Sequence, residues 1–530
     1  MGGRCVRRSP NSPLKPGRRK ALLGWLRAGA RDERGAAAVF FAVSMILLTP
    51  IVLGMADIYL GSTQRTQLQD ALDAATLFAA RSTANTTPTV DTVGDRALLA
   101  NLVLPAGVTL VSSNFTLSGD TVIGYAEITA PAIAPGVWPH ANITANAKVV
   151  RSLDRLEVAL VLDNTGSMSG TKLTNTKTAA NTLIDTLVTA AAQSTLTDPL
   201  KISLVPFSMT VRVQNTTSLT SYNTTTHTGT GIPTWLDPEA KAEVAAGTDN
   251  FDVQTDRFKL MKQMGLSWAG CVESRQQPYD IQETAPTSGT AATMFVPYFW
   301  PDEPDSSAGY WYENDYLPDG TNSNSWLTRQ KNSAKYTQAP TSGDGPNQDC
   351  TMQPLIRLTT ATATVKTAIN AMVATGETNV PMGLMWGWHT LSPNTPFADG
   401  AAYNSTHLRK IIILMTDGDN TNTNPSSYNG NASYYEGLGY IWQNLLGITS
   451  GSDSTRTTKM NARFTALCTN VKAQGITIYT VGVGVSNSSK TLLQGCATST
   501  DKYYDVTAAS DLNAAFAAIA GSINALRISH

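Results

Sequence analysis

The sequence predicts an α/β protein with a doubly wound sheet, and two observations lead to this prediction. The first is a set of continuous apolar runs, at 156–163 ("LEVALVLD"), 201–208 ("KISLVPFS"), 410–419 ("KIIILMTDGD") and 475–484 ("GITIYTVGVG"). Such runs are typical of parallel strands that are covered on both faces. The second is that helix-like stretches alternate with these runs, which indicates helices on both sides of a parallel sheet.

A long apolar segment lies upstream of this α/β region. Residues 35–56 contain 22 residues without a charge, and a helix of about 20 apolar residues is long enough to cross a bilayer. Residues 1–35 carry ten Lys and Arg against two acidic residues, so the positive-inside rule places the head in the cytoplasm. A cleaved signal peptide is the rival interpretation, but no A-x-A site follows closely. We therefore predict a basic head at 1–34 and an uncleaved transmembrane helix at 35–60.

The region after the membrane segment divides into a helix and a small spacer. Leu68, Leu72, Ala75 and Ala79 recur at helical spacing, which predicts that the membrane helix continues to about residue 82. Residues 83–152 show short alternating patterns with turn signals and are predicted to form a β-rich spacer.

The α/β domain is predicted at 153–526, with an insertion at about 208–355. The insertion is aromatic and rich in turn residues, and it is too long for one ordinary loop. Its acidic run is predicted to be a solvated face, with calcium binding as the alternative; the residues are Asp302, Glu303, Asp305, Glu313, Asp315 and Asp319. The chain after residue 35 has a net charge of −9, which argues against binding to nucleic acid.

Four cysteines follow the membrane segment, an even number that suits an oxidising compartment. They are Cys271, Cys350, Cys468 and Cys496. Three pairings are possible, and sequence order favours Cys271–Cys350 and Cys468–Cys496.

The candidate site begins where the first strand ends. Asp163 closes that strand, and the hydroxyl residues Thr165 and Ser167 follow at once. Asp417 ends a second strand, and Thr378 lies in a glycine-containing loop ahead of a helix. Because the carboxyl ends of parallel strands meet at one edge, these residues are predicted to face one crevice. The alternative is that Asp163 and Thr165 only cap the following helix.

These residues resemble the metal-ion-dependent adhesion site of von Willebrand factor A (VWA) domains. The resemblance implies a Rossmann-like VWA domain and a single Mg²⁺, with Mn²⁺ as an alternative. The implied ligands are Asp163, Thr165, Ser167, Thr378 and Asp417, with threonine at 165 where the family usually has serine. Mg²⁺ prefers six oxygen ligands. A first shell of neutral hydroxyls leaves the ion able to attract one more carboxylate, which a protein partner would supply.

The stretch "RDERGAAAVFFAVSMILL" is similar to the start of TadE/TadG-like proteins, which take part in tight-adherence (Flp) pilus assembly. The resemblance covers most of the chain from about residue 31, with a TadG-like N-terminal region at 31–82. The anchor, spacer and interrupted VWA domain together resemble TadG. Pilin-type leaders have a glutamate five residues after the cleaved glycine, whereas Phe40 stands five residues after Gly35. This difference argues against cleavage by a prepilin peptidase. The resemblance implies a bacterial inner-membrane protein with one membrane helix.

Three functions are compatible with these features. The favoured one is a membrane-anchored, extracytoplasmic, metal-dependent binding protein that acts in pilus assembly or adhesion and is not an enzyme. A hydrolase is the second, but the sequence contains no G-x-S-x-G, P-loop or HExxH motif. His389, in a Trp-rich segment, is predicted to be a packed or hydrogen-bonded residue and not a catalytic base. A chelatase-type or sensory VWA protein is the third.

Overall fold

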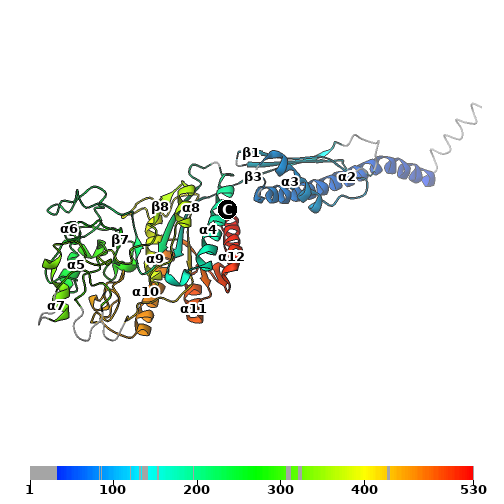
Figure 1. Ribbon diagram of the computed structural model, residues 1–530. Helices are drawn as coiled ribbons and strands as arrows, with labels where there is room; N and C mark the ends of the chain where they lie inside the picture. Colours follow the sequence, from blue (N-terminus) through cyan, green and yellow to red (C-terminus); the bar gives the residue numbers. More distant parts are fainter. Residues whose placement is uncertain are drawn as a thin grey trace, which may run out of the picture. The chain divides into compact units, whose positions relative to one another are not determined.

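The computed structural model describes residues 33–528 except 83, 85, 120, 131–132, 134–140, 152–153, 195, 306–311, 320–324 and 426–429. The chain forms two compact units, residues 1–151 and 152–530 (Figure 1). The predicted basic head lies outside the described residues, apart from its last two positions.

The first unit begins with one long helix, α2 (Glu33–Arg81), which contains Pro50. Among the described residues, its apolar part is the one segment long and apolar enough to cross a membrane, although a signal sequence near the N-terminus has the same properties. The apolar side chains of this part are exposed, including Phe40 at 74%, Ile46 at 71% and Ile58 at 75%. An exposed helix segment that is apolar on all sides is suited to a lipid environment.

The second half of α2 packs on a small sheet. Leu68, Leu72, Ala75 and Ala79 are fully buried, which confirms the predicted helix face. Their partners lie on a three-stranded antiparallel sheet of order β1-β2-β3. The strands are β1 (Leu110–Ser118), β2 (Thr121–Ile128) and β3 (Ile143–Val150).

The first part of the predicted β-rich spacer is helical, which corrects the sequence analysis. Helix α3 (Thr87–Asn101) has Pro88 in its first turn, where a missing N–H costs nothing. The Thr89 hydroxyl also accepts a hydrogen bond from the backbone N–H of Thr86 at 3.2 Å. At Gly94, an added Cβ would lie 2.3 Å from the Phe115 ring, so the glycine allows close packing of α3 on β1. Pro is common at a helix start, so the Thr-Pro sequence is compatible with the beginning of α3.

The second unit is built on a six-stranded sheet of order β11-β10-β9-β4-β5-β8. Five strands are parallel, namely β4 (Arg155–Asp163), β5 (Leu200–Phe207), β9 (Leu408–Thr416), β10 (Thr477–Val483) and β11 (Tyr503–Val506). The edge strand β8 (Ile356–Thr359) is antiparallel to β5. The α/β class is therefore confirmed, and the sheet is mixed rather than wholly parallel.

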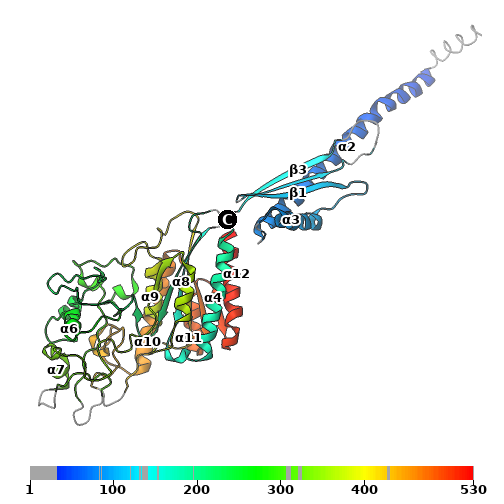
Figure 2. The ribbon, with the colours of Figure 1, turned by 45° about the horizontal axis from the view of Figure 1, so that its top comes forward.

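Helices cover both faces of this sheet. On one face lie α4 (Thr171–Ala191), α8 (Thr362–Asn370) and α12 (Leu512–Ile528), with α4 and α12 side by side (Figures 1 and 2). On the other lie α9 (Val380–Leu391), α10 (Asp453–Ala473) and α11 (Asn487–Cys496). Alternate residues of a strand point to opposite faces. In β4, Leu160 and Leu162 pack in the first layer and Val161 in the second, which explains the continuous apolar run.

The described part of the segment between β5 and β8, residues 208–355, has little regular structure. Its strands and helices are β6 (Val211–Arg212), α5 (Lys241–Ala246), α6 (Arg257–Gln263), β7 (Cys271–Val272) and α7 (Trp326–Lys331). The 3₁₀ turns of the second unit are η1 (Gly166–Met168), η2 (Tyr279–Ile281), η3 (Ala291–Thr293), η4 (Ser333–Lys335), η5 (Ile441–Gln443), η6 (Thr500–Lys502) and η7 (Ala509–Asp511). Tyr298 and Trp300 of this segment pack with Tyr435 and Tyr440. The latter two belong to the loop after β9, so a second loop, which the sequence analysis overlooked, contributes to this packing.

Two disulfides join parts of the second unit. They are Cys271–Cys350, which closes a separation of 79 residues, and Cys468–Cys496, which closes one of 28. This is the pairing that sequence order favours. The second bond links α10 to the end of α11.

Candidate metal centre

Asp163 and Asp417 lie at the carboxyl ends of two neighbouring strands. Asp163 is the last residue of β4, and Asp417 directly follows the last residue of β9. The two strands are adjacent and parallel, with Leu162 opposite Met415. Ligands of open α/β sheets bind at this edge. The fold therefore brings both carboxylates to the usual location of a binding site.

Four of the five predicted ligands form one hydrogen-bonded network. Thr165 Oγ1 lies 2.9 Å from Ser167 Oγ, and Ser167 Oγ donates to Asp417 Oδ1 at 2.6 Å. Asp163 Oδ1 accepts from the backbone N–H of Thr165 at 2.8 Å. Asp163, Thr165 and Asp417 are buried, whereas Ser167 is exposed. The network is thus open to solvent at Ser167.

The fifth predicted ligand, Thr378, borders the same space from a third loop. An added Cβ on Gly418 would lie 3.8 Å from Thr378 Oγ1 and 3.9 Å from Ser167 Oγ. The loops are tied together by backbone hydrogen bonds, from Gly166 N–H to Gly376 O at 3.0 Å and from Thr421 N–H to Thr378 O at 2.9 Å. All five residues therefore meet at one edge of the sheet.

The helix-cap interpretation of this motif is wrong. The N-cap of α4 is Gly170, and no side chain caps that helix. The Thr165 hydroxyl makes no cap hydrogen bond to the short turn η1 either, and contacts Ser167 instead. The Asp163 carboxylate accepts two hydrogen bonds. One comes from the backbone N–H of Thr165, and the other from Thr416 Oγ1, which donates to Oδ2 at 2.6 Å. The side-chain oxygens are therefore arranged around one another and not around a helix end.

The site concentrates negative charge. Burial, and then the neighbouring Asp417 carboxylate, raise the pKa of Asp163 to about 6, although hydrogen bonds from Thr165 and Thr416 act in the opposite direction. Lys172, on the first turn of α4, forms an ion pair with Asp417 Oδ2. Among the described residues, no three His, Cys, Asp or Glu side chains converge where they could hold a metal ion. The candidate centre therefore consists of two carboxylates and three hydroxyls.

Two residues of the site were not predicted from the sequence. Thr416 orients Asp163, and Lys172 pairs with Asp417. Thr416 directly precedes a predicted ligand, so its position at the strand end was a usable signal. Lys172 carried no comparable signal, because its partner lies 245 residues away in the sequence.

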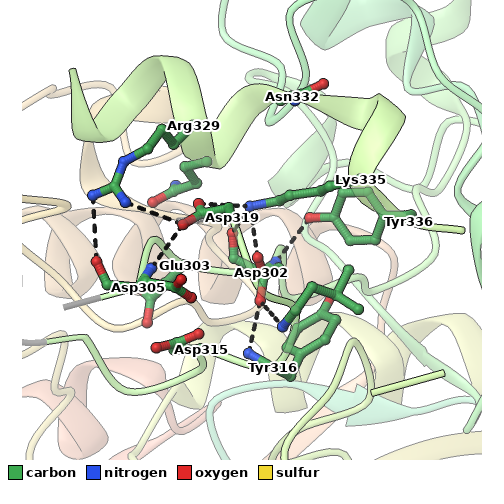
Figure 3. Close-up of polar contacts among 12 residues, drawn as sticks. Asp302, Glu303, Asp305, Asp315, Tyr316, Asp319, Arg329, Asn332, Lys335 and Tyr336 are labelled. Carbon is green, nitrogen blue, oxygen red and sulfur yellow. Dashed lines mark hydrogen bonds and ion pairs between the residues drawn. The ribbon is translucent and has the colours of Figure 1, made fainter. Parts of the chain in front are cut away.

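The acidic run of the insertion is not a solvated face, which corrects the prediction. Asp302 and Glu303 are buried, at 0% and 1% exposure. Asp302 accepts from the backbone N–H groups of Tyr316 and Leu317 and pairs with Lys335 at 2.6 Å (Figure 3). These carboxylates therefore act as internal acceptors that shape the insertion.

Other members of the run are also engaged. Asp319 pairs with Arg329 at 3.1 Å, and its Oδ1 accepts from the Asp305 N–H (Figure 3). Burial and the carboxylates of Asp305 and Asp302 raise the pKa of Asp315 to about 7. Lys335 and Arg329 neutralise part of the charge of the run, and among the described residues no three His, Cys, Asp or Glu side chains converge here where they could hold a metal ion.

His389, the histidine of the Trp-rich segment, is fully buried and packs against Phe295 and Trp386. Burial, and then the charge of Arg275, hold the pKa of this imidazole well below its ordinary value. Neither ring nitrogen has a hydrogen-bond partner among the described residues. A neutral ring enclosed by aromatic side chains is a packing residue, as predicted.

Comparison with known proteins gives only weak similarities. No protein-family model matches the chain, and no curated protein matches it. A solved structure of the pilus adhesin SpaC from Lactobacillus rhamnosus GG is 12% identical, with a TM-score of 0.31, over 80% of this chain and 36% of SpaC. The chain thus spans about a third of SpaC.

Two further structures are similar to the same degree. The vWF domain of the type V pili tip protein Mfa5 from Porphyromonas gingivalis is 13% identical, with a TM-score of 0.31, over 71% of this chain and 97% of that domain. Proximal thread matrix protein 1 from the mussel byssus, with a zinc-occupied MIDAS motif, is 12% identical, with a TM-score of 0.27. The similarity covers 69% of this chain and 47% of that protein. These values are too low to assign a function to this chain, so its own residues must carry the assignment.

Proposed function

We propose that this protein is a membrane-anchored, VWA-type binding protein whose second unit holds one Mg²⁺ and captures a carboxylate of a protein partner. The ligands would be Asp163, Thr165, Ser167, Thr378 and Asp417. The observation that carries the proposal is the network of hydroxyl and carboxylate oxygens at the sheet edge, open to solvent at Ser167.

The spacing of the hydroxyls fits the metal. Mg²⁺ takes octahedral oxygen ligands at roughly 2.0–2.1 Å, so neighbouring ligands are about 2.9 Å apart. Thr165 Oγ1 and Ser167 Oγ are 2.9 Å apart. All five donors are oxygens, which Mg²⁺ and Mn²⁺ prefer over nitrogen or sulfur. A bound ion would supply a positive charge at the solvent-exposed side, where a partner's carboxylate can reach it.

The setting proposed for this activity is the assembly or adhesive function of a tight-adherence (Flp) pilus. We propose that α2 anchors the chain in the bacterial inner membrane with the basic head in the cytoplasm and the second unit outside it. The exposed apolar surface of α2 and the two disulfides support this arrangement, because disulfides persist in oxidising compartments.

Calorimetric titration of the detergent-solubilised full-length protein with MgCl₂ tests the metal site. Thr165→Val keeps the side-chain shape but removes the oxygen, and it should abolish Mg²⁺ binding, as should Asp417→Ala. Thr165→Ser keeps the hydroxyl and should bind Mg²⁺ like the wild type. An Mg²⁺ affinity that is unchanged in Thr165→Val would refute the proposed ligand set.

A further inference from the structure

Lys172 is the one cation that forms an ion pair with either site carboxylate, among the residues that the structure describes. Its ammonium contacts Asp417 Oδ2, while Asp417 Oδ1 accepts from Ser167. Both oxygens of this carboxylate are therefore occupied, one by a proposed metal ligand and the other by the ammonium. The Asp417 side chain is 0% exposed and that of Lys172 is 38% exposed, so the ammonium can withdraw into solvent whereas the carboxylate cannot.

The position of Lys172 in its helix is unfavourable by itself. It is the second residue of α4, whose first turn contains no acidic residue. A helix N-terminus carries a partial positive charge, which repels a cation. Long amine side chains at such positions ordinarily extend into water. The Asp417 carboxylate therefore holds Lys172 at a place that the helix dipole disfavours.

From this geometry we infer that Lys172 is a tethered cation that competes with the divalent metal ion for Asp417. Without metal, the ammonium neutralises Asp417 and keeps the site intact. When Mg²⁺ binds, the ammonium leaves Asp417 for solvent, because two cations held by the same carboxylate repel each other. Lys172 thereby lowers the apparent affinity for Mg²⁺. The inference rests on the proposed metal site and concerns its regulation.

The first experiment is a calorimetric titration of the full-length protein in detergent with MgCl₂. Lys172→Met should bind Mg²⁺ about two- to fivefold more tightly than the wild type, since a partly exposed ion pair contributes at most on the order of a fivefold effect. Lys172→Arg keeps the charge and should not gain affinity. Lys177→Met is the matched control on the same helix, because Lys177 bonds to Asn370 O and not to the site.

The second experiment measures acetylation of Lys172 by acetic anhydride, followed by peptide mass spectrometry. Acetylation should be several-fold faster with saturating Mg²⁺ than without it, while that of Lys177 should not change. Asp417→Asn should make Lys172 react fast under both conditions.

The outcomes separate the two proposals. If the wild type binds Mg²⁺ and Lys172→Met binds it no more tightly, with Lys172 acetylation indifferent to Mg²⁺, the competition is refuted and the metal site stands. If neither protein binds Mg²⁺, the metal site and the competition both fail.

Discussion

The buried cluster around Arg257 allows the sharpest prediction about stability. Arg257 is fully buried in the insertion and donates to Glu243 Oε2 at 3.2 Å and to Asp249 Oδ1 at 2.8 Å. Its Nε also lies 3.9 Å from Glu273 Oε1. Three carboxylates, each at most 3% exposed, therefore surround one guanidinium group. Arg257→Met should lower the free energy of unfolding by about 3–5 kcal/mol at pH 7.5, because it leaves unpaired buried charges.

The loss of unfolding free energy in Arg257→Met should depend on pH, and the direction of this dependence follows from the titration of the buried carboxyl groups. Burial raises the pKa of Glu273 from an ordinary 4.5 to about 6, and burial together with the Glu273 charge raises the pKa of Glu243 well above its ordinary value. A raised folded-state pKa stabilises the protein below the unfolded value, and this stabilisation is lost as the pH rises through the folded value. For Glu273 the loss lies between pH 4.5 and about 6 and is worth about 2 kcal/mol.

Urea unfolding of the full-length protein, followed by tryptophan fluorescence at pH 5 and pH 7.5, measures both effects. The Arg257→Met deficit should be smaller at pH 5, where the carboxyl groups can take up protons. Glu243→Gln, which is neutral at every pH, should flatten the decline in stability between these pH values. Lys259→Met is the control on the same helix, with an exposed side chain. A deficit in Arg257→Met that equals that of the control, or that is larger at pH 5, would contradict the reasoning.

Two further predictions concern the disulfides and the membrane topology. Replacing both Cys468 and Cys496 with serine should cost roughly 3–4 kcal/mol of unfolding free energy, because the bond closes a loop of 28 residues in the unfolded chain. Urea unfolding under non-reducing conditions measures this, and a loss below about 1 kcal/mol would show that loop closure contributes little in this chain. A reporter that is active only in an oxidising compartment, fused after His530, should be active in bacterial cells, and an inactive fusion that is still produced would contradict the proposed topology.

Local patterns in the sequence determined much of this fold. The apolar runs predicted the central strands because side chains buried on both faces leave no polar positions in a strand. The repeat of Leu68, Leu72, Ala75 and Ala79 predicted the buried face of α2 because helical periodicity relates near neighbours. The positions of Asp163 and Asp417 at strand ends predicted their proximity, because parallel strands share one carboxyl edge.

Tertiary structure alone decided the remaining features. The acidic run after Trp300 looked like solvated surface, but Lys335, Arg329 and backbone N–H groups make its burial possible. The pairing of Lys172 with Asp417 joins residues 245 positions apart. Such contacts depend on which surfaces meet after folding, and a local sequence pattern contains no information about them. Periodicity and turn chemistry therefore determined the elements and the edge where the site lies, whereas the partners that neutralise each buried charge came only from three-dimensional packing.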